Sequence, residues 1–344
     1  MPLRIAVVAP PWFEVPPPGY GGIERICHEI VEGLVARGHE VTLVAVGSSV
    51  TAARLVAPLP KPPSGLGRPE GPGEEARWAA LVHRALEKLA VDVVHDHSLA
   101  GPLAGMGRSV PTVVTCHGAF HAWVEDYYAA LGMPLIAISE AQRRAAPGLP
   151  WVATIHNAIA VAAWPFRAAK DGYALFLGRM SPEKGAHLAP EVARAAGVPL
   201  VVAAKCNEPD ELRYFEEEVA PRFGPETTWA GVAAGARRAE LIARARCLLV
   251  PVQWEEPFGL ALVEALACGT PVVGLARGAV PEIVRHGRTG WVAQDVEELA
   301  AFVARAGEID PHACRADAVA RFDIPAFVAR HEDAYRRVLD GAAS

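Results

Sequence analysis

The feature that most constrains this fold is a repeated alternation of short β-branched runs with longer helical stretches. In the first half, the runs predict buried strands at Arg4 to Ala9, Val41 to Val46, Val91 to His95, Thr112 to Cys116 and Leu135 to Ile138. The alternation restarts after Trp164 and Pro165, with strands expected at Tyr173 to Leu177, Leu200 to Ala204, Cys247 to Val250 and Pro271 to Gly274. Apolar strands separated by helices are typical of parallel sheets covered on both faces. With 344 residues available, we predict two doubly wound α/β domains.

Composition excludes several classes of protein. The net charge of -6 disfavours nucleic acid as a partner, because nucleic acid requires a basic face. At 51% apolar residues the chain lies in the globular range, and we expect no transmembrane helix. The opening run is read as a strand rather than a signal segment, since Arg4 interrupts it and Pro10 and Pro11 follow. The six cysteines contain no C-x-x-C pair, which predicts reduced thiols in a cytoplasmic protein.

The turn after the first strand argues against two common nucleotide-dependent enzymes. It reads PPWFEVPPPGYGG and lacks the G-x-G-x-x-G spacing of dinucleotide-binding dehydrogenases. A P-loop sequence is also absent, which disfavours a phosphotransferase of that class. Further along, residues 57 to 75 are rich in proline and glycine and predict a loop.

Three clusters of residues indicate a site for a phosphorylated ligand. In the first, Gly19, Gly21 and Gly22 precede a helix expected to run to about Arg37. Glycines allow close backbone approach, and the free N–H groups of a helix start suit a phosphate or a sugar hydroxyl. An ordinary loop-to-helix turn explains the same residues.

The second cluster is GRMSPEKG, at residues 178 to 185, directly after a predicted strand. Arg179 provides a planar fork for two phosphate oxygens and Lys184 a compact point charge, a combination suited to a diphosphate. The alternative is a solvated charge pair with Glu183.

The third cluster is WEEPFGLALVEALACG, at residues 254 to 269. Pro257 suits a first helical turn, which predicts Glu256 at the helix cap and Glu264 about 12 Å further along the axis. Two carboxylates at that separation match the sugar and the ribose of a nucleotide diphosphate sugar. The diphosphate would then meet the intervening N–H groups, those of Phe258, Gly259 and Leu260. A buried helix with one cap and one isolated glutamate is the alternative.

Histidines follow two of the predicted strands. His117 lies just after an apolar strand, at the carboxyl end where open α/β sheets bind ligands, although a lone histidine is more often structural. His95 and His97 flank Asp96, and as alternate strand residues they share a face. Two ligands are too few for a metal site, so we expect no metal there.

The chain resembles family 4 of the retaining glycosyltransferases over nearly its whole length. Besides the three clusters, the resemblance rests on four segments in the expected order: DVVHDHS at 92 to 98, TCHG at 115 to 118, AISEAQR at 137 to 143 and PEIVRHGRTGWV at 281 to 292. It implies the GT-B fold, in which two Rossmann-like domains face each other across a deep cleft. The expected domains are an acceptor domain, 1 to 165, and a nucleotide-sugar donor domain, 166 to 323. The resemblance, together with an apolar face that needs burial, implies that a final helix at about 324 to 341 packs back on the first domain.

The resemblance also implies roles for single residues. Arg179 and Lys184 would hold the donor diphosphate and Glu264 the ribose. Glu256 would lie against the transferred sugar, and His117 would bind its far hydroxyl. The remaining donor contacts are expected at Gly21, Gly22, Phe258, Gly259, Leu260 and, beside the base, Val232.

The implied reaction is transfer of a hexosyl-type sugar from a UDP-, GDP- or ADP-sugar to an unidentified hydroxyl acceptor, with retention of configuration. No D-x-D sequence occurs, and Arg179 and Lys184 already oppose the charge of the leaving group, so no divalent metal and no other cofactor is expected. The chain departs from the family at Asn157-Ala158-Ile159-Ala160 and at Ala203-Ala204-Lys205-Cys206, which leaves donor choice open. Lys205 is expected to add charge near the diphosphate or, with slight preference, to be solvated.

Two other functions fit the same clusters: a nucleotide-sugar epimerase or hydrolase of this fold, and a noncatalytic sugar-nucleotide sensor. The acceptor is expected to be a small molecule, a glycan or a lipid. Aromatic residues of the first half could line its site or belong to the core: Trp12, Phe13, Phe120, Trp123, Tyr127 and Tyr128. Because no basic amphipathic helix is evident, the sequence gives only weak support to peripheral membrane contact.

Overall fold

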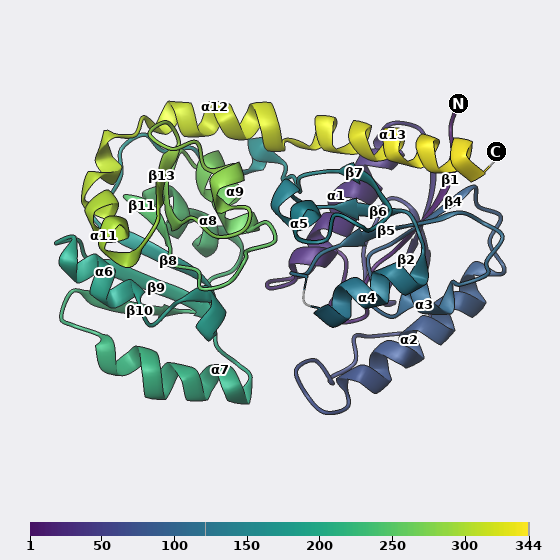
Figure 1. The fold of residues 1–344 in the computed structure, drawn as a ribbon, viewed down its shortest axis with the longest axis horizontal. Helices are drawn as coiled ribbons and strands as arrows, with labels where there is room; N and C mark the ends of the chain where they lie inside the picture. The colour runs from purple at the N-terminus through teal and green to yellow at the C-terminus, as the bar shows by residue number, and fades with distance from the viewer. Residues whose placement is uncertain (121, 343–344) are drawn as a thin grey trace. The chain divides into compact units, whose positions relative to one another are not determined.

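The computed structural model describes residues 1–120 and 122–342, which divide into two compact α/β units. Unit 1 comprises Met1–Ala158 together with the chain from Ile324 onward, and unit 2 comprises Ile159–Asp323. The first division falls before Ile159, earlier than the expected boundary at 165. Figure 1 shows the helices and strands of each unit. The prediction of two parallel, Rossmann-like sheets is confirmed.

Unit 1 contains a seven-stranded parallel sheet in the order β3-β2-β1-β4-β5-β6-β7. Its strands are β1 (Arg4–Val8), β2 (Glu40–Val44), β3 (Arg54–Val56), β4 (Val93–Asp96), β5 (Thr112–Cys116), β6 (Leu135–Ala137) and β7 (Trp151–Thr154). Its helices are α1 (Gly22–Ala36), α2 (Gly71–Leu86), α3 (Gly101–Ala104), α4 (Ala122–Leu131), α5 (Glu140–Ala145) and α13 (Ile324–Ala342). Strand order reverses direction between β1 and β4, so this pair forms the topological switch point.

Unit 2 contains a six-stranded parallel sheet in the order β10-β9-β8-β11-β12-β13. Its strands are β8 (Ala174–Arg179), β9 (Leu200–Lys205), β10 (Thr227–Gly231), β11 (Cys247–Val250), β12 (Val272–Leu275) and β13 (Gly290–Ala293). Its α-helices are α6 (Ala189–Ala195), α7 (Pro209–Tyr214), α8 (Gly235–Arg244), α9 (Leu260–Ala267), α10 (Val280–Ile283), α11 (Val296–Arg305) and α12 (Pro311–Phe322). Here the switch point lies between β8 and β11.

Four strands were not predicted, namely β3, β7, β10 and β13. Each forms an end of its sheet. Three of them, β3, β7 and β10, are partly exposed and therefore lack the continuous apolar run of a central strand. The predicted loop at 57 to 75 is also too long, because α2 begins at Gly71, where Pro72 occupies the first turn and needs no helical N–H partner.

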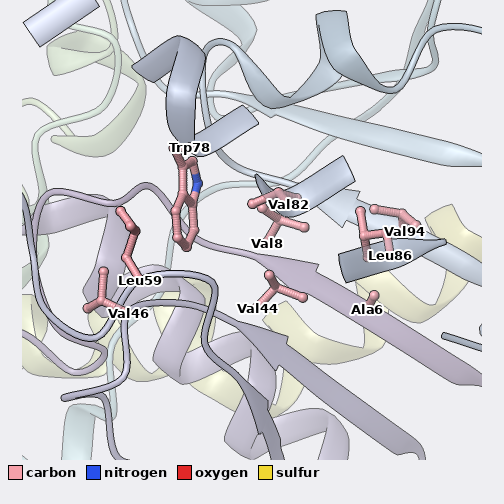
Figure 2. Packing of buried hydrophobic residues seen from close by; sticks show 9 residues of the cluster. All are labelled: Ala6, Val8, Val44, Val46, Leu59, Trp78, Val82, Leu86 and Val94. Atoms are coloured by element: carbon pink, nitrogen blue, oxygen red, sulfur yellow. The ribbon is translucent and has the colours of Figure 1, made fainter. Parts of the chain in front are cut away.

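Between the sheet of unit 1 and α2 lies a core of aliphatic side chains around one indole (Figure 2). Trp78 of α2 is fully buried against Val8, Val46 and Leu59. Its Nε1 donates to the carbonyl of Ala9 at 3.1 Å, which satisfies the buried N–H. The indole therefore holds α2 against the end of β1, at the switch point.

The last helix, α13, belongs to unit 1, where it contacts α1 and β7. Phe327, Val328 and Tyr335 form its buried face. Polar contacts also hold α13 in place. The carboxylate of Glu332 lies 2.5 Å from Nε2 of His39 and 2.6 Å from Nη2 of Arg37. Within the described residues, none of the helices combines the length and hydrophobicity that crossing a membrane requires.

The contact between α1 and α13 leaves no room for a side chain at Gly33. A Cβ there would lie 2.3 Å from Cγ2 of Val328. Replacing glycine by alanine in a helix usually stabilises it by about 1 kcal/mol, whereas overpacking costs about 1–3 kcal/mol. We expect Gly33→Ala to destabilise unit 1 by roughly 1 kcal/mol, measured by denaturant unfolding and by faster hydrogen exchange in α13.

The matched control is Gly73→Ala in α2, where an added Cβ has no atom within 4 Å. This change should be neutral or stabilising. Equal stabilisation by the two substitutions would contradict the close packing of α13 on α1.

Candidate functional site

In unit 2, the turn after β8 packs directly against the segment that follows β11. Gly185 closes the turn with φ of 72°, and a Cβ at this position would lie 1.9 Å from the carbonyl oxygen of Pro251. The backbone N–H of Gln253 donates to the carbonyl of Glu183 at 2.8 Å. The GRMSPEKG turn and the WEEPFG segment therefore meet at the switch point, as the carboxyl ends of adjacent parallel strands must.

A cation and a carboxylate meet where these two segments touch. Nζ of Lys184 lies 2.5 Å from Oε2 of Glu256, whose side chain is only 8% exposed. The indole of Trp254 donates to the same oxygen at 3.0 Å, and its ring lies under the ammonium group, 4.7 Å from Nζ. Lys184 and Glu256 thus form a mostly buried ion pair rather than a solvated one.

The backbone of Glu256 is held by the loop after β12. The N–H of Ala279 donates to its carbonyl at 2.8 Å. A Cβ on Gly278 would lie within 2.4 Å of the nitrogen and oxygen of Glu256, so only glycine allows this approach. Three neighbouring strands, β8, β11 and β12, therefore fix the position of this carboxylate.

The predicted helical position of Glu256 is wrong. Helix α9 begins at Leu260, and its N-cap is Gly259, whose φ of 85° interrupts the helix on the N-terminal side. Glu256 and Pro257 precede the helix, so the distance of about 12 Å along one axis does not apply. Phe258 is buried against Phe322. Leu260 is the first residue of the helix, so its N–H is one of those that have no partner within the helix.

Glu264 is buried within α9 and has a partner that the sequence analysis missed. Nε of Arg238, in α8, donates to Oε2 of Glu264 at 2.9 Å, and Nη2 bonds the same oxygen. Only 2% of Glu264 is exposed. A carboxylate among apolar neighbours requires such a partner, and that requirement was the available signal.

Two other charged residues of unit 2, Arg179 and Lys205, also have partners. Arg179 pairs with Glu183, as the alternative interpretation held, but its Nε is buried without a hydrogen-bond partner in the described part of the chain. Lys205 is 9% exposed and bonded to Glu208 and Glu211, so the preferred expectation of a solvated lysine is wrong. Val232 follows β10 directly and is 48% exposed.

In unit 1, Gly21 caps α1 and Gly22 begins it. The φ of Gly21 is 141°, and a Cβ there would lie 2.7 Å from Pro17 and 3.2 Å from Oε2 of Glu24. Glu24 is 3% exposed, and burial raises the pKa of its carboxyl to about 7. The glycine pair therefore lies beside the buried carboxyl group of Glu24, a residue that the sequence analysis did not single out.

His117 follows β5, is partly exposed, and lies beside the buried histidines His97 and His95. Its Nε2 lies 2.9 Å from Nδ1 of His97, and burial lowers the pKa of His117 to about 3. His97 lies 3.3 Å from His95, so the expected shared face of the latter two is observed. Among the described residues, no group of three or more potential ligands is arranged to hold a metal ion.

The aromatic residues of the first half divide between core and surface. Tyr128 is buried, and Phe120 packs on it and on Trp151. Trp12 donates to Glu75 at 2.5 Å. Trp123 is 59% exposed, so it is the aromatic side chain of this set most open to a ligand.

Comparison with known proteins identifies the family of the chain. Residues 164–318 match the family described as "Glycosyl transferases group 1", and residues 20–145 match "Glycosyltransferase Family 4". A glycogen synthase of Mycobacterium tuberculosis is 30% identical over 88% of this chain and 85% of its own length. A phosphatidyl-myo-inositol mannosyltransferase of Mycolicibacterium smegmatis is 29% identical over 93% of this chain and 88% of its own length. The structure of AviGT4, a glycosyltransferase involved in avilamycin A biosynthesis, aligns with a TM-score of 0.75 and 28% identity over 99% of both chains.

The two parallel sheets, together with the likeness to AviGT4, show the GT-B fold, and the family matches show a glycosyltransferase. The chain belongs to glycosyltransferase family 4.

Burial of Glu24, beside the glycine pair, predicts that the stability of the protein depends on pH. Because the folded-state pKa of Glu24 is raised from 4.5 to about 7, the folded state holds more protons than the unfolded state in this window. The contribution of Glu24 to the stability of the folded state is complete below pH 4.5 and is lost as the pH rises through about 7. We expect Glu24→Gln to gain stability over the parent protein across this window, by up to about 3 kcal/mol.

The measurement is hydrogen exchange of β1 and α1 amides at several pH values, with Glu40→Gln as a control at an exposed position. The histidines act with the opposite sign. The lowered pKa values of His117, about 3, and His331, about 4, mean that stability falls as pH drops below about 6.5. Since both proteins share these histidines, their effect cancels in the difference, and a pH-independent difference would contradict the prediction.

Proposed function

We propose that this glycosyltransferase moves a hexosyl-type sugar from a nucleotide diphosphate sugar to a hydroxyl acceptor, with retention of configuration. UDP, GDP and ADP are the candidate nucleotides. The observation that carries the proposal is the contact of 2.5 Å between Lys184 and Glu256 at the switch point of unit 2.

The charges of this pair complement the bond that must break. A glycosyl phosphate separates into a sugar with positive charge and a phosphate with negative charge. Glu256 is suited to the sugar side and Lys184 to the phosphate side, and burial strengthens both interactions. In the absence of donor the two side chains neutralise each other.

The remaining donor contacts follow from neighbouring residues. Arg179 offers a buried Nε without a partner in the described chain, suited to a second phosphate oxygen. The N–H groups at the start of α9, at Leu260, add a partial positive charge, and those of Phe258 and Gly259 lie just before it. Both bonds from Arg238 go to Oε2 of Glu264, which leaves Oε1 to accept ribose hydroxyls.

Unit 1 is proposed to supply the acceptor side, and its Gly21 and Gly22 are proposed to contact the donor. Neutral His117 is suited to bonding a hydroxyl of the transferred sugar, because its pKa of about 3 keeps it uncharged at neutral pH. The exposed backbone at Val232 is proposed to lie beside the base. A cytoplasmic location is proposed from the six free cysteines.

The deciding experiment is nucleotide release from a panel of UDP-, GDP- and ADP-sugars. Each donor is assayed alone and then with sugar, α-glucan, phosphatidylinositol and small-molecule hydroxyl acceptors. Release that depends on an acceptor supports transfer, and product anomers identified by NMR test retention. Sugar release without acceptor indicates a hydrolase, and binding without turnover indicates a sensor.

Metal removal provides a separate prediction. Because Arg179, Lys184 and the start of α9 already oppose the charge of the leaving diphosphate, we expect transfer to continue in EDTA at an unchanged rate. A loss of activity in EDTA that Mg²⁺ or Mn²⁺ restores would show that the diphosphate needs a metal ion.

Charge removal at the β8 turn tests the diphosphate assignment. Arg179→Ala and Lys184→Ala are each expected to weaken donor binding and to lower kcat, since charge on the leaving group grows in the transition state. Calorimetry with donor and steady-state kinetics measure the two effects. Arg213→Ala, at an exposed arginine of the same unit, is the control and should change neither. Unaltered affinity and turnover in folded Arg179→Ala would remove the assignment.

The two glutamates are expected to differ in their kinetic effects. Glu264 meets a ribose whose bonding changes little, so Glu264→Ala should chiefly raise KM. Glu256 lies beside the developing positive charge, so Glu256→Ala should chiefly lower kcat, on the order of a hundredfold. Circular dichroism confirms folding before the kinetics are measured, and the reverse pattern would mean that the donor binds in the opposite direction.

A further inference from the structure

A continuous line of hydrogen bonds leads from His117 into the interior of unit 1. We call it the imidazole chain: His117, His97 and His95, ending at Tyr335 and Thr115. Nε2 of His117 lies 2.9 Å from Nδ1 of His97, and Nε2 of His97 lies 3.3 Å from Nδ1 of His95. Nδ1 of His95 also lies 2.8 Å from the hydroxyl of Tyr335, and Nε2 of His95 lies 2.7 Å from Oγ1 of Thr115.

Three elements of unit 1 bring these groups together. His95 lies in β4, and His97 follows that strand on the same face. Thr115 lies in β5, the neighbouring parallel strand, and His117 follows it in the same way. Tyr335 comes from α13, far along the chain. The last helix therefore contacts the inner end of a chain whose outer end is His117.

The imidazole chain consists of neutral groups, which are buried at its inner end and partly exposed at His117. His95 and Tyr335 are fully buried and His97 is 3% exposed. Burial lowers the pKa values of His95, His97 and His117 and raises that of Tyr335. Each imidazole therefore carries a single N–H at neutral pH, and each contact between two nitrogens needs one proton.

The direction of every hydrogen bond follows once the donor at the inner end is assigned. A phenol O–H is a stronger acid than the N–H of a neutral imidazole, so we assign the hydroxyl of Tyr335 as the donor to Nδ1 of His95. His95 then carries its proton on Nε2 and donates to Thr115. Because Nδ1 of His95 is bare, the facing Nε2 of His97 must hold a proton.

The same logic continues to the outer end of the chain. With its proton on Nε2, His97 presents a bare Nδ1, so the proton between it and His117 belongs to Nε2 of His117. We propose that His97 is a positioning residue, and that Tyr335 acts through it to hold His117 as the Nε2–H tautomer with a bare Nδ1. The catalytic consequence rests on the proposed role of His117 as a ligand of the transferred sugar.

This tautomer sets a requirement for the sugar. A bare Nδ1 accepts but does not donate, so the group of the sugar that faces His117 must be a donor, as a hydroxyl is. A donor sugar with fluorine in place of that hydroxyl should be used poorly, because fluorine and a bare nitrogen both lack a proton.

The tautomer is tested directly by NMR of the full chain with ¹⁵N-labelled histidine, and His117→Gln assigns the His117 signals by their loss. The expected spectrum shows a protonated Nε2 and a bare Nδ1 at His117. Tyr335→Phe removes the terminal donor and should produce a mixture of the two tautomers. A protonated Nδ1 in the parent protein, or an unchanged tautomer in Tyr335→Phe, would overturn the proposal.

Kinetics then separate positioning from packing. Asparagine keeps an acceptor oxygen near the place of Nδ1 of His97, whereas leucine keeps only volume. We expect His97→Leu to lower kcat about tenfold with little change in KM, equivalent to the loss of one hydrogen bond, and His97→Asn to recover most of this loss. If His97→Leu does not fold, Tyr335→Phe provides the same comparison.

The control is Tyr173→Phe in unit 2. This change removes a phenol hydroxyl as Tyr335→Phe does, but the hydroxyl of Tyr173 donates to the carbonyl of Leu241 and not to a histidine. It should alter neither the tautomer nor kcat. Equal kcat in His97→Leu and the parent would overturn positioning and leave the proposed function intact. The expected tautomer in a protein that transfers sugar to no acceptor would leave the tautomer assignment standing and remove the proposed function.

Discussion

Parallel strand pairing is the constraint on which both halves of this protein depend. In each sheet every strand ends at the same edge, and strand order reverses once, between β1 and β4 in unit 1 and between β8 and β11 in unit 2. Loops after these strands diverge and leave space at the edge. The glycine pair and the histidines follow strands at or beside the first reversal, and the Lys184–Glu256 pair lies at the second.

In the proposed donor site of unit 2, buried carboxylates are paired with cations. Glu256 and Glu264 are both buried, and each has a cation from another element, Lys184 or Arg238. A buried carboxylate without such a partner would be costly. Each pair therefore holds its carboxylate in a fixed orientation.

Unit 1 uses neutral groups instead. Its buried histidines have lowered pKa values, and its buried acid Glu24 has a raised one, so burial suppresses charge in both cases. Uncharged groups transmit orientation through hydrogen bonds, as the imidazole chain does from Tyr335 to His117. The docking of α13 is consequently part of the environment of His117, although the two are far apart in sequence.

The sequence by itself determined the class of fold and the location of the important segments, because strand burial and glycine placement are local patterns. It predicted the central strands, the helix after Gly22 and the GRMSPEKG turn. It could not determine contacts between segments distant in the chain. The partner of Glu264, the start of α9 at Leu260 and the pairing of Lys205 were missed or wrong. Only the tertiary structure decided these, since an ion pair, a left-handed glycine at a helix start and a line of buried imidazoles depend on where packed elements meet.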